Sequence, residues 1–427
     1  EMKDSGIAWI GEIPKGWSIC RIKDVICLYT GNSIKDEEKD IYTDKLDAYP
    51  YISTKDIDVV YYTINYDNGL YTKKDDIFFK NADIGSSLVC IEGGSAGKKK
   101  AFVEQKISFV NKLCCFAPKN INGKYSFYHL CSSNFEFQFN KFVTGLIGGV
   151  SVSVLKNFIM ILPPLLEQQK IAEFLDRKCA EIDELVALQE KMIEELKAYK
   201  QSVITEAVTK GLNPNAPMKD SGIEWIGEIP EHWEVKPLKW DFEIIAGATP
   251  KTDNIDFWDG NIPWVTPADY KTEDVYIEKG KRFLSEKGVE SCATTLLPKN
   301  SIIFSKRAPI GLVVVNSQPL CTNQGCLGCI PKQDIVKYFY YVISVFTEQY
   351  ELYGSGTTFK EISANNFANF KLPFPNATEQ QQIADYLDKR CAEIDELVAV
   401  KQQKIETLKE YKKSLIYEYV TGKKEVI

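Results

Sequence analysis

The chain repeats itself, and this feature restricts its possible folds more than any other. Residues 2–14, which read Met-Lys-Asp-Ser-Gly-Ile-Ala-Trp-Ile-Gly-Glu-Ile-Pro, return at 218–230 with twelve of thirteen positions identical. Residues 179–187, Cys-Ala-Glu-Ile-Asp-Glu-Leu-Val-Ala, return unchanged at 391–399. The shift along the sequence is nearly the same for both segments, so the two copies have nearly equal lengths. A repeat of this kind predicts one architectural unit that is built twice.

The sequences between the shared ends differ. Residues 18–161 and 234–371 share only scattered strand-like patterning. A constant frame with divergent inserts indicates that the frame has one task, whereas the inserts recognise two different things.

A long helical pattern follows each insert. The prolines of 162–164 and 372–373 end the inserts. Stripe positions then recur every seven residues, at Leu175, Ile182, Gln189, Leu196 and Val203 and at Leu387, Ile394, Lys401, Leu408 and Leu415. We expect a second stripe three residues further on, at Leu185, Met192, Tyr199, Leu397 and Tyr411. Heptads of this length predict coiled-coil helices, with Gly211 and Gly422 as stops.

Gln189 and Lys401 occupy the same repeat position, inside the apolar stripe. One interpretation is that these polar residues are tolerated on partly exposed helices. The other is that the polar pair fixes the register between the two helices. The sequence leaves both open.

The inserts read as mixtures of strands and helices. Short apolar runs predict strands at 76–79, 87–91, 108–110, 301–304 and 311–315. Residues 125–142 and 336–352 have helical patterns. The predicted fold class is α+β, in which two α/β domains are separated by two long helices.

Composition sets limits on the function. The chain has 427 residues, is 44% hydrophobic and contains no apolar run long enough to span a membrane. We therefore expect a cytoplasmic protein whose 12 cysteines are thiols. Its net charge is −7, and neither insert is basic, since residues 1–160 hold 20 Lys+Arg against 19 Asp+Glu and residues 213–378 hold 16 against 20. A nucleic acid is a polyanion, so this charge balance does not by itself favour binding to DNA. Either the chain does not bind DNA, or its cations gather on one face, or a partner supplies positive surface.

Motifs of common catalytic sites are missing from the sequence. Residues 93–99 approach a phosphate-binding loop but have the wrong spacing, and no Asn/Asp-Pro-Pro-aromatic segment of an adenine methyltransferase occurs. Two histidines give little material for a metal site or a catalytic triad. Cys326 and Cys329 would form a zinc site only with Cys321 or Cys292, and the simpler interpretation is a buried strand. We expect no catalytic residue, metal or cofactor.

Several motifs together resemble the specificity subunits of type I restriction–modification systems. Residues 220–233, Asp-Ser-Gly-Ile-Glu-Trp-Ile-Gly-Glu-Ile-Pro-Glu-His-Trp, look like the lead-in to a target recognition domain of that family. Thr249-Pro250, the run 257–266 and the loops 322–325 and 354–358 are similar to further hallmarks. The first insert departs from the pattern, because it lacks the Trp-Asp-Gly-Asn-Ile-Pro-Trp run and its residues 148–150 match the Gly-Ser-Gly-Thr-Thr loop poorly.

The resemblance implies an architecture and a set of partners. Residues 1–161 and 213–371 would be target recognition domains, here called head 1 and head 2, and residues 162–212 and 372–427 would be two long antiparallel helices related by a pseudo-two-fold axis. Each head would bind one half of a bipartite, asymmetric site on double-stranded DNA. Two methyltransferase subunits would dock on the chain, and restriction–motor subunits on them. Helix length would set the gap between half-sites.

Candidate DNA contacts are loop residues that can hydrogen-bond to bases or phosphates. They are Lys80, Asn81, Lys98, Lys99 and Lys100 in head 1, and Thr249, Lys251, Ser305, Lys306, Arg307, Asn323, Gln324, Ser355, Thr357, Thr358 and Lys360 in head 2. The alternative function is a structural adaptor whose two heads bind proteins and ignore DNA.

Overall fold

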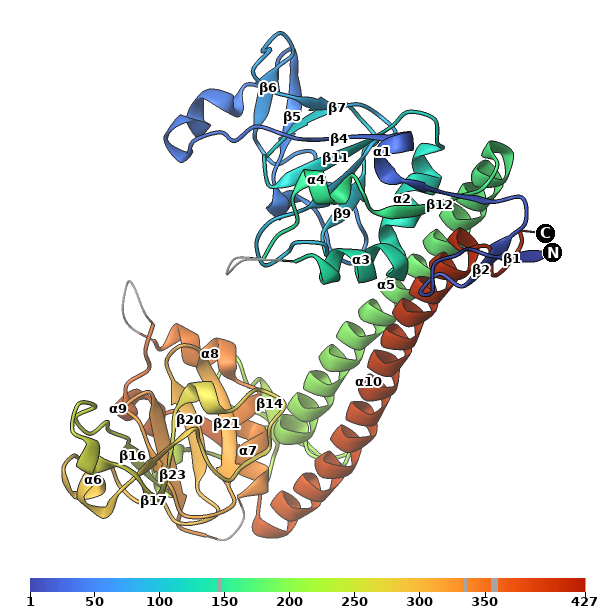
Figure 1. Ribbon diagram of the computed structural model, residues 1–427. Coiled ribbons are helices and arrows are strands. Elements are labelled where there is room, and N and C mark those ends of the chain that lie inside the picture. Colours follow the sequence, from blue (N-terminus) through green and yellow to red (C-terminus); the bar gives the residue numbers. More distant parts are fainter. Residues whose placement is uncertain (144–147, 334–335, 355–359, 427) are drawn as a thin grey trace. The chain divides into compact units, whose positions relative to one another are not determined.

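The computed structural model describes residues 1–143, 148–333, 336–354 and 360–426. The chain divides into two compact units, one made of residues 1–191 and 401–427 and the other of residues 192–400. The long helices α5 (Leu165–Lys210) and α10 (Ala377–Val420) each contribute to both units (Figure 1). The predicted α+β class is confirmed. No helix in the described ranges has the length and hydropathy that crossing a membrane requires.

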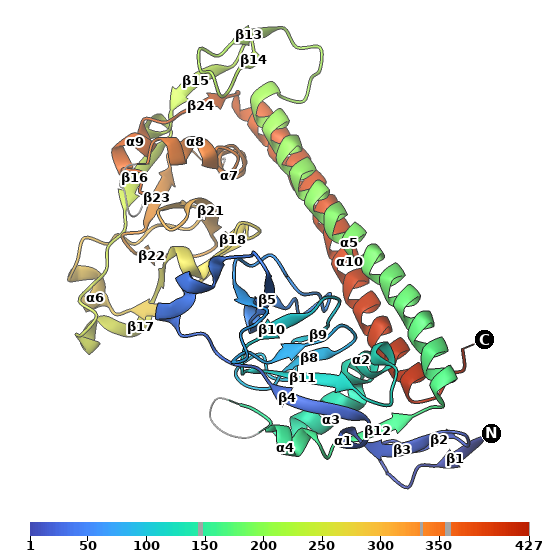
Figure 2. The same ribbon diagram turned by 90° about the horizontal axis from the view of Figure 1, so that it is seen from above.

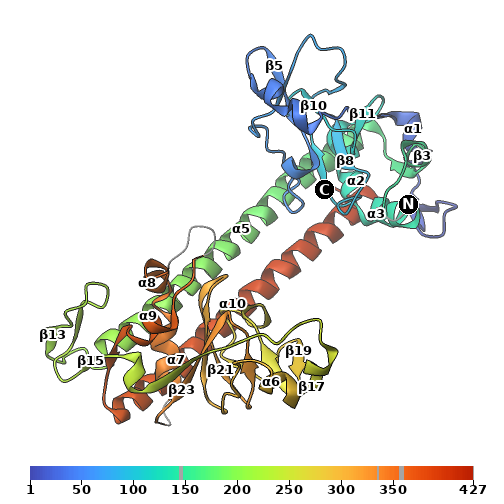
Figure 3. The ribbon, with the colours of Figure 1, turned by 90° about the vertical axis from the view of Figure 1, so that its left-hand side faces the viewer.

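Head 1 contains two four-stranded sheets (Figure 3). The first is antiparallel, in the order β4 (Ile26–Thr30), β11 (Leu113–Pro118), β8 (Ser87–Cys90), β9 (Lys100–Phe102). The second has the order β6 (Tyr71–Lys73), β5 (Ala48–Ile52), β10 (Ile107–Phe109), β7 (Asn81–Ala82). Helix α2 (Gly123–Cys131) packs on the first sheet and is followed by α3 (Ser133–Lys141). The remaining elements are β1 (Met2–Asp4), β2 (Glu12–Pro14), β3 (Ser18–Arg21), α1 (Ile22–Val25), η1 (Asp36–Thr43), η2 (Thr54–Asp56), α4 (Val152–Leu155) and β12 (Ile159–Leu162).

Head 2 is built around a five-stranded sheet (Figure 1). Its order is β16 (Phe242–Ala246), β23 (Cys326–Pro331), β20 (Ile302–Lys306), β21 (Ile310–Asn316), β18 (Tyr276–Ile277). A three-stranded sheet has the order β19 (Arg282–Leu284), β17 (Trp258–Val265), β22 (Cys321–Thr322). Helices α7 (Lys337–Ser344) and α8 (Thr347–Leu352) pack on β21. The remaining elements are β13 (Met218–Asp220), β14 (Glu228–Pro230), β15 (Glu234–Pro237), η3 (Leu238–Trp240), η4 (Ile255–Phe257), η5 (Pro267–Asp269), α6 (Glu286–Glu290), α9 (Ala364–Ala368) and β24 (Lys371–Phe374).

The two heads have the same plan although their sequences differ. A parallel strand pair joins Ile52 to Phe109 in head 1 and Val265 to Thr322 in head 2, and both partners are shifted along the sequence by the same amount. A serine or threonine capping box follows β5 and β17, at residues 53 and 266. Backbone pairing does not depend on side-chain identity. The divergent inserts are therefore two versions of one fold, as the family resemblance implied, although their sequences share only scattered patterning.

The seam of the long helices follows the first predicted stripe. Leu175, Ile182, Gln189, Val203, Leu387, Ile394 and Leu415 are buried, and Leu196, Lys401 and Leu408 are half-buried. The predicted second stripe is wrong: Met192 is half-buried, but Leu185, Tyr199, Leu397 and Tyr411 are 44–54% exposed. The seam instead continues four residues after the first stripe, at Cys179, Val186, Ile193, Cys391 and Ile405. A heptad alternates steps of three and four, and the prediction placed the two steps in the wrong order.

Each long helix contributes its N-terminal part to one unit and its C-terminal part to the other. Lys412 Nζ of α10 contacts Asp183 of α5 at 2.7 Å in one unit, and Lys200 Nζ of α5 contacts Asp395 of α10 at 2.7 Å in the other. The lysines stand at equivalent positions of the repeat, and so do the aspartates. In each unit the N-terminal part of one helix packs with the C-terminal part of the other, so the pair is antiparallel (Figure 2). Swapped contacts of this kind are typical of two-fold relations.

In each unit the tryptophan that follows the repeated segment contacts the ends of the two long helices. Trp17 Nε1 donates to Glu167 in the first turn of α5 at 2.6 Å, and Trp233 Nε1 donates to Glu379 of α10 at 3.4 Å. Gly211 has φ +74°, and a Cβ there would lie 3.1 Å from Trp233. A Cβ on Gly422 would lie 3.0 Å from Trp17. The same tryptophan thus holds the start of one helix and the end of the other, which explains why this segment is repeated.

Three predicted elements differ from the structure. Residues 76–79 are not a strand, because Ile77 and Phe78 are exposed in a turn. The expected helix at 125–142 is two helices, α2 and α3, separated at Ser132, whose hydroxyl donates to His129 O. The expected helix at 336–352 is likewise divided into α7 and α8.

Candidate nucleic-acid interface

Four segments of head 2 meet at one edge of its five-stranded sheet. Antiparallel pairing places Ala246, the end of β16, opposite Leu327, and Ser305, near the end of β20, opposite Cys326. The loops that continue from these strand ends therefore lie together. We call residues 247–251, 306–309, 323–325 and 360–362 the head 2 edge.

Hydrogen bonds join these segments. Thr249 Oγ1 donates to Gln324 Oε1. Lys306 N donates to Gly325 O at 2.9 Å, and Ile362 N donates to Lys306 O at 3.1 Å. Predicted DNA contacts that lie far apart in the sequence are thus brought onto one surface.

Cations on this edge share one carboxylate. Glu361 lies 2.7 Å from Lys306 Nζ and 3.5 Å from Arg307 Nη1. Lys306 is largely covered, whereas the Arg307 side chain is 37% exposed. Lys251 and Lys360 are exposed. A single carboxylate against four cations leaves the edge positive, although head 2 as a whole is acidic.

A glycine and two tryptophans shape the edge. A Cβ on Gly247 would lie 2.3 Å from Asn323 O, so only glycine lets this loop pass so close to the 323–325 turn. Trp264 Nε1 donates to Ala248 O and Trp258 Nε1 to Lys251 O, both at 3.1 Å. Both tryptophans are buried, and their hydrogen bonds fix the backbone of the 247–251 loop.

Most of the head 2 residues predicted from sequence lie on this edge. Those brought together are Thr249, Lys251, Lys306, Arg307, Asn323, Gln324 and Lys360. Ser305 requires a correction: it is fully buried, donates to Pro309 O and accepts from Leu312 N, so it is not available to DNA. Ser355, Thr357 and Thr358 lie outside the described residues.

The head 1 residues predicted from sequence are mostly occupied within the fold. Lys100 requires a correction, because it is only 1% exposed and its Nζ lies 3.3 Å from Glu136. Lys99 Nζ donates to Thr54 O at 2.7 Å. Asn81 Oδ1 accepts from Ser108 at 2.7 Å. Lys80 is exposed, and its backbone N–H donates to Asn32 Oδ1 at 3.1 Å.

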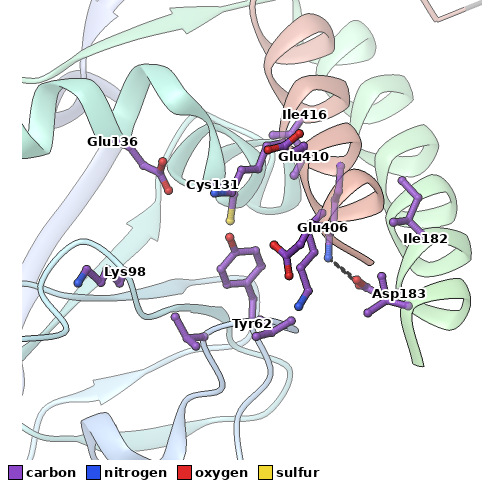
Figure 4. A pocket seen from close by; sticks show the side chains of 15 residues that line it. Tyr62, Lys98, Cys131, Glu136, Ile182, Asp183, Glu406, Glu410 and Ile416 are labelled. Carbon is purple, nitrogen blue, oxygen red and sulfur yellow. Dashed lines mark hydrogen bonds and ion pairs between the residues drawn. The ribbon is translucent and has the colours of Figure 1, made fainter. Parts of the chain in front are cut away.

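Lys98 lines a pocket of about 400 Å³ that lies between head 1 and the long helices within the first unit (Figure 4). Tyr62, Ile182 and Asp183 are among its lining residues (Figure 4). Its lysines, Lys98, Lys409, Lys412 and Lys413, are balanced by Glu136, Asp183, Glu406 and Glu410. A pocket with balanced charge offers no particular attraction to a polyanion, so Lys98 is not grouped with the edge residues.

Head 1 also has counterparts of the head 2 edge that were not among the residues predicted from sequence. Gly31 to Lys35 read Gly-Asn-Ser-Ile-Lys and follow β4 as Gly247 to Lys251, Gly-Ala-Thr-Pro-Lys, follow β16. Ser33 and Lys35 therefore stand where Thr249 and Lys251 stand. The signal was present in the sequence, because the shift that relates these two loops is the one that relates the two copies of the lead-in.

The Cys326/Cys329 pair cannot share a metal ion within its strand. The two residues lie three apart in β23, so their side chains project from opposite faces of the sheet, and they belong to different core clusters. Burial raises the pKa of the Cys326 thiol to about 12. The described residues hold no group of three or more acidic, cysteine or histidine side chains suited to a metal.

Two heads of one fold on a frame of paired helices, with loops gathered at one sheet edge of head 2 and an equivalent loop in head 1, define a two-headed recognition protein. The model of the type I restriction modification DNA specificity domain matches residues 14–198 and 230–410. These matches span most of the chain, and the chain belongs to this family. It is a DNA specificity subunit, and the adaptor alternative is not favoured.

Relatives and solved structures agree with this assignment. The MjaX protein of Methanocaldococcus jannaschii, described as a putative type I restriction enzyme specificity subunit, is 28% identical over 97% of this chain and 95% of its own length. The MjaIX specificity subunit of the same organism is 38% identical, but the match spans only 43% of this chain and 42% of that relative.

Two solved structures share the fold. A chain from a study of complex assembly and conformational transition of the type I R-M system has a TM-score of 0.73 at 18% identity, covering 96% of this chain and 98% of that one. The HsdS subunit of Thermoanaerobacter tengcongensis has a TM-score of 0.51 at 17% identity, with the same coverage of both chains.

Proposed function

We propose that the two heads read the two halves of a bipartite, asymmetric sequence on double-stranded DNA. Residues 1–161 and 213–371 form the two target recognition domains, and residues 162–212 and 372–427 form the helical frame. Since the heads share a fold but differ in their edge residues, their half-sites differ. Two identical heads would read a palindrome.

The head 2 edge is the observation that carries this proposal. Arg307 can bind guanine through two hydrogen bonds, and the amide groups of Asn323 and Gln324 can bind adenine. Asn323 Oδ1 already accepts from Gly325 N at 2.9 Å, so its contact with a base comes from its NH₂ group. Lys251 and Lys360, which are exposed, supply charge for phosphates.

In this proposal, methyltransferase and restriction–motor subunits supply the catalytic activities. The role exchange between α5 and α10 presents the frame twice, which suits two copies of one methyltransferase subunit. Restriction–motor subunits would join these. In this proposal the chain itself is not catalytic and needs no cofactor, and it selects the site for enzymes that act on it.

Arg307→Ala, expressed with the methyltransferase subunit, tests the proposal. Methylation should become less selective, or weaker, at bases of one half-site only, because Arg307 belongs to one head. Lys299→Ala is the matched control, since Lys299 is exposed before β20, at the opposite end of the strand from Arg307. Equal loss at both half-sites would show that Arg307 has a structural role, and unchanged methylation would argue against the head 2 edge.

A further inference from the structure

We propose that Asn111 reads a base in the half-site of head 1, and that Lys112 and Lys35 hold the neighbouring phosphates. This inference rests on the proposed function and names the recognition residues of the head that departs from the family's sequence pattern.

The backbone around Asn111 matches the backbone around Gln324. Leu113 N donates to Val110 O at 3.1 Å, and Cys326 N donates to Asn323 O at 3.0 Å. Each turn begins with the same contact: Val110 N donates to Ile52 O at 2.9 Å, and Asn323 N to Val265 O at 3.0 Å. One constant shift along the sequence relates all the partners in head 1 to those in head 2. Asn111 therefore stands in head 1 where Gln324 stands in head 2.

The loop beside this turn also has its counterpart. Asn32 N donates to Phe109 O at 3.0 Å, as Ala248 N donates to Thr322 O at 3.0 Å. A Cβ on Gly31 would lie 1.8 Å from Phe109 O, so this glycine permits the same close approach as Gly247. The loop that carries Ser33 and Lys35 is thereby held against the turn that carries Asn111 and Lys112.

The side chains of this loop and turn are accessible, and lysines lie among them, although Asp36, Glu37 and Glu38 follow Lys35 along the chain. Ser33, Asn111 and Lys112 are exposed. The Lys35 side chain is 78% exposed, and its ion pair with Glu38, at 3.4 Å, is too exposed to neutralise it firmly. The backbone N–H of Lys80 donates to Asn32 Oδ1, so Lys80 lies beside the same loop. Three lysines thus lie on segments that adjoin the turn of the exposed Asn111 amide.

The chemistry gives the members of this cluster different tasks. An asparagine amide can donate to N7 and accept from the N6 amino group of adenine, as a glutamine amide can, and no other base presents this pair of groups in the major groove. A lysine ammonium has no acceptor and binds phosphate as a point charge. Asn111 should therefore determine which base is recognised at one position, whereas Lys112 should add affinity without changing the recognised motif.

The Asn111→Ala and Asn111→Asp variants test base reading in the complete complex with the methyltransferase subunit, by mapping methylated adenines. We expect selectivity to fall about tenfold at one position of one half-site, with the other half-site unchanged. Asp is nearly isosteric but lacks the amide donors. Lys112→Ala should keep the motif and reduce the slope of log affinity against log salt by about 1.

The double variant Lys119→Ala/Asn120→Ala is the matched control, because this exposed pair lies at the other end of β11. It should change neither motif nor salt slope. If Gln324→Ala alters one half-site while both Asn111 variants leave the motif intact, the inference fails and the proposed function stands. If Gln324→Ala and Arg307→Ala also change nothing, the proposed function fails. Lowered thermal stability with loss at both half-sites in both Asn111 variants would assign Asn111 a structural role and overturn the inference.

Discussion

His129 shows how strongly one buried residue can link the stability of head 1 to pH. It lies in α2, is fully buried and has the ammonium of Lys100 nearby. Burial, with a smaller contribution from Lys100, lowers the pKa of His129 from 6.5 to about 4. The folded state therefore holds the neutral imidazole, whereas the unfolded chain binds a proton below about pH 6.5.

The first prediction concerns this linkage. Since the folded pKa is depressed, the stabilising contribution is complete above pH 6.5 and is lost as the pH falls from 6.5 towards 4. The loss over this range is on the order of 3 kcal/mol. Replacing His129 with Leu should remove this part of the pH dependence, measured by urea unfolding at several pH values. Parallel curves for both proteins between pH 6.5 and 4 would contradict the account.

Gly31 gives a second prediction at the same scale. A methyl group there would meet Phe109 O at 1.8 Å, so Gly31→Ala must displace the backbone of the 31–35 loop or of Phe109. We expect a loss of about 1–3 kcal/mol in the free energy of unfolding. Gly16→Ala is the control, because a Cβ on Gly16 meets nothing within 4 Å, and it should change stability by less than about 0.5 kcal/mol. Chemical denaturation distinguishes the two, and equal effects would show that the close approach is not needed.

Among the elements, the helices were easier to predict than the sheets. The prolines and heptads located α5 and α10 to within a few residues, since local spacing decides helix burial. The seven-residue repeat at Leu175 and Ile182 gave one stripe correctly, but the prediction completed the seam at Leu185, whereas Val186 completes it in the structure. That choice depends on the partner helix, which single-helix spacing does not contain.

The sheets depended on pairing between distant segments, and so did the recognition edge. Lys100 and Ser305 looked like surface residues in the sequence, because each lies beside charged neighbours, but β9 and β20 are covered on both faces at these positions, so both side chains are buried. Asn111 did not stand out in the sequence, since its correspondence with Gln324 follows from backbone hydrogen bonds of two equivalent turns. The 31–35 loop was recognisable from the repeat alone.

The seam provides the third prediction. Gln189 is buried and Lys401 is half-buried at repeat-equivalent positions of the two long helices. If the polar pair fixes the register, the double substitution Gln189→Leu/Lys401→Leu should raise the thermal midpoint and reduce the uniqueness of helix pairing. Calorimetry together with disulfide trapping of neighbouring registers measures both properties. Unchanged stability and pairing would instead favour mere tolerance of polar residues.

For the molecule as a whole, the important result is that one fold carries two different edges. Head 1 presents Asn111 and Lys112 where head 2 presents Gln324 and Gly325. The frame contacts are repeated, with Lys412–Asp183 in one unit and Lys200–Asp395 in the other. The net charge of −7 shows that the cations at the edges are local features. Much of the affinity for DNA should then come from partner subunits, while this chain determines the sequence.

The central claim, that two different heads read two different half-sites, is tested most directly by mapping methylated adenines across the genome of cells that carry this chain with its methyltransferase subunit. The account predicts one split motif whose two halves differ and are separated by a spacer of fixed length. A continuous motif, or a palindromic one with identical halves, would contradict it.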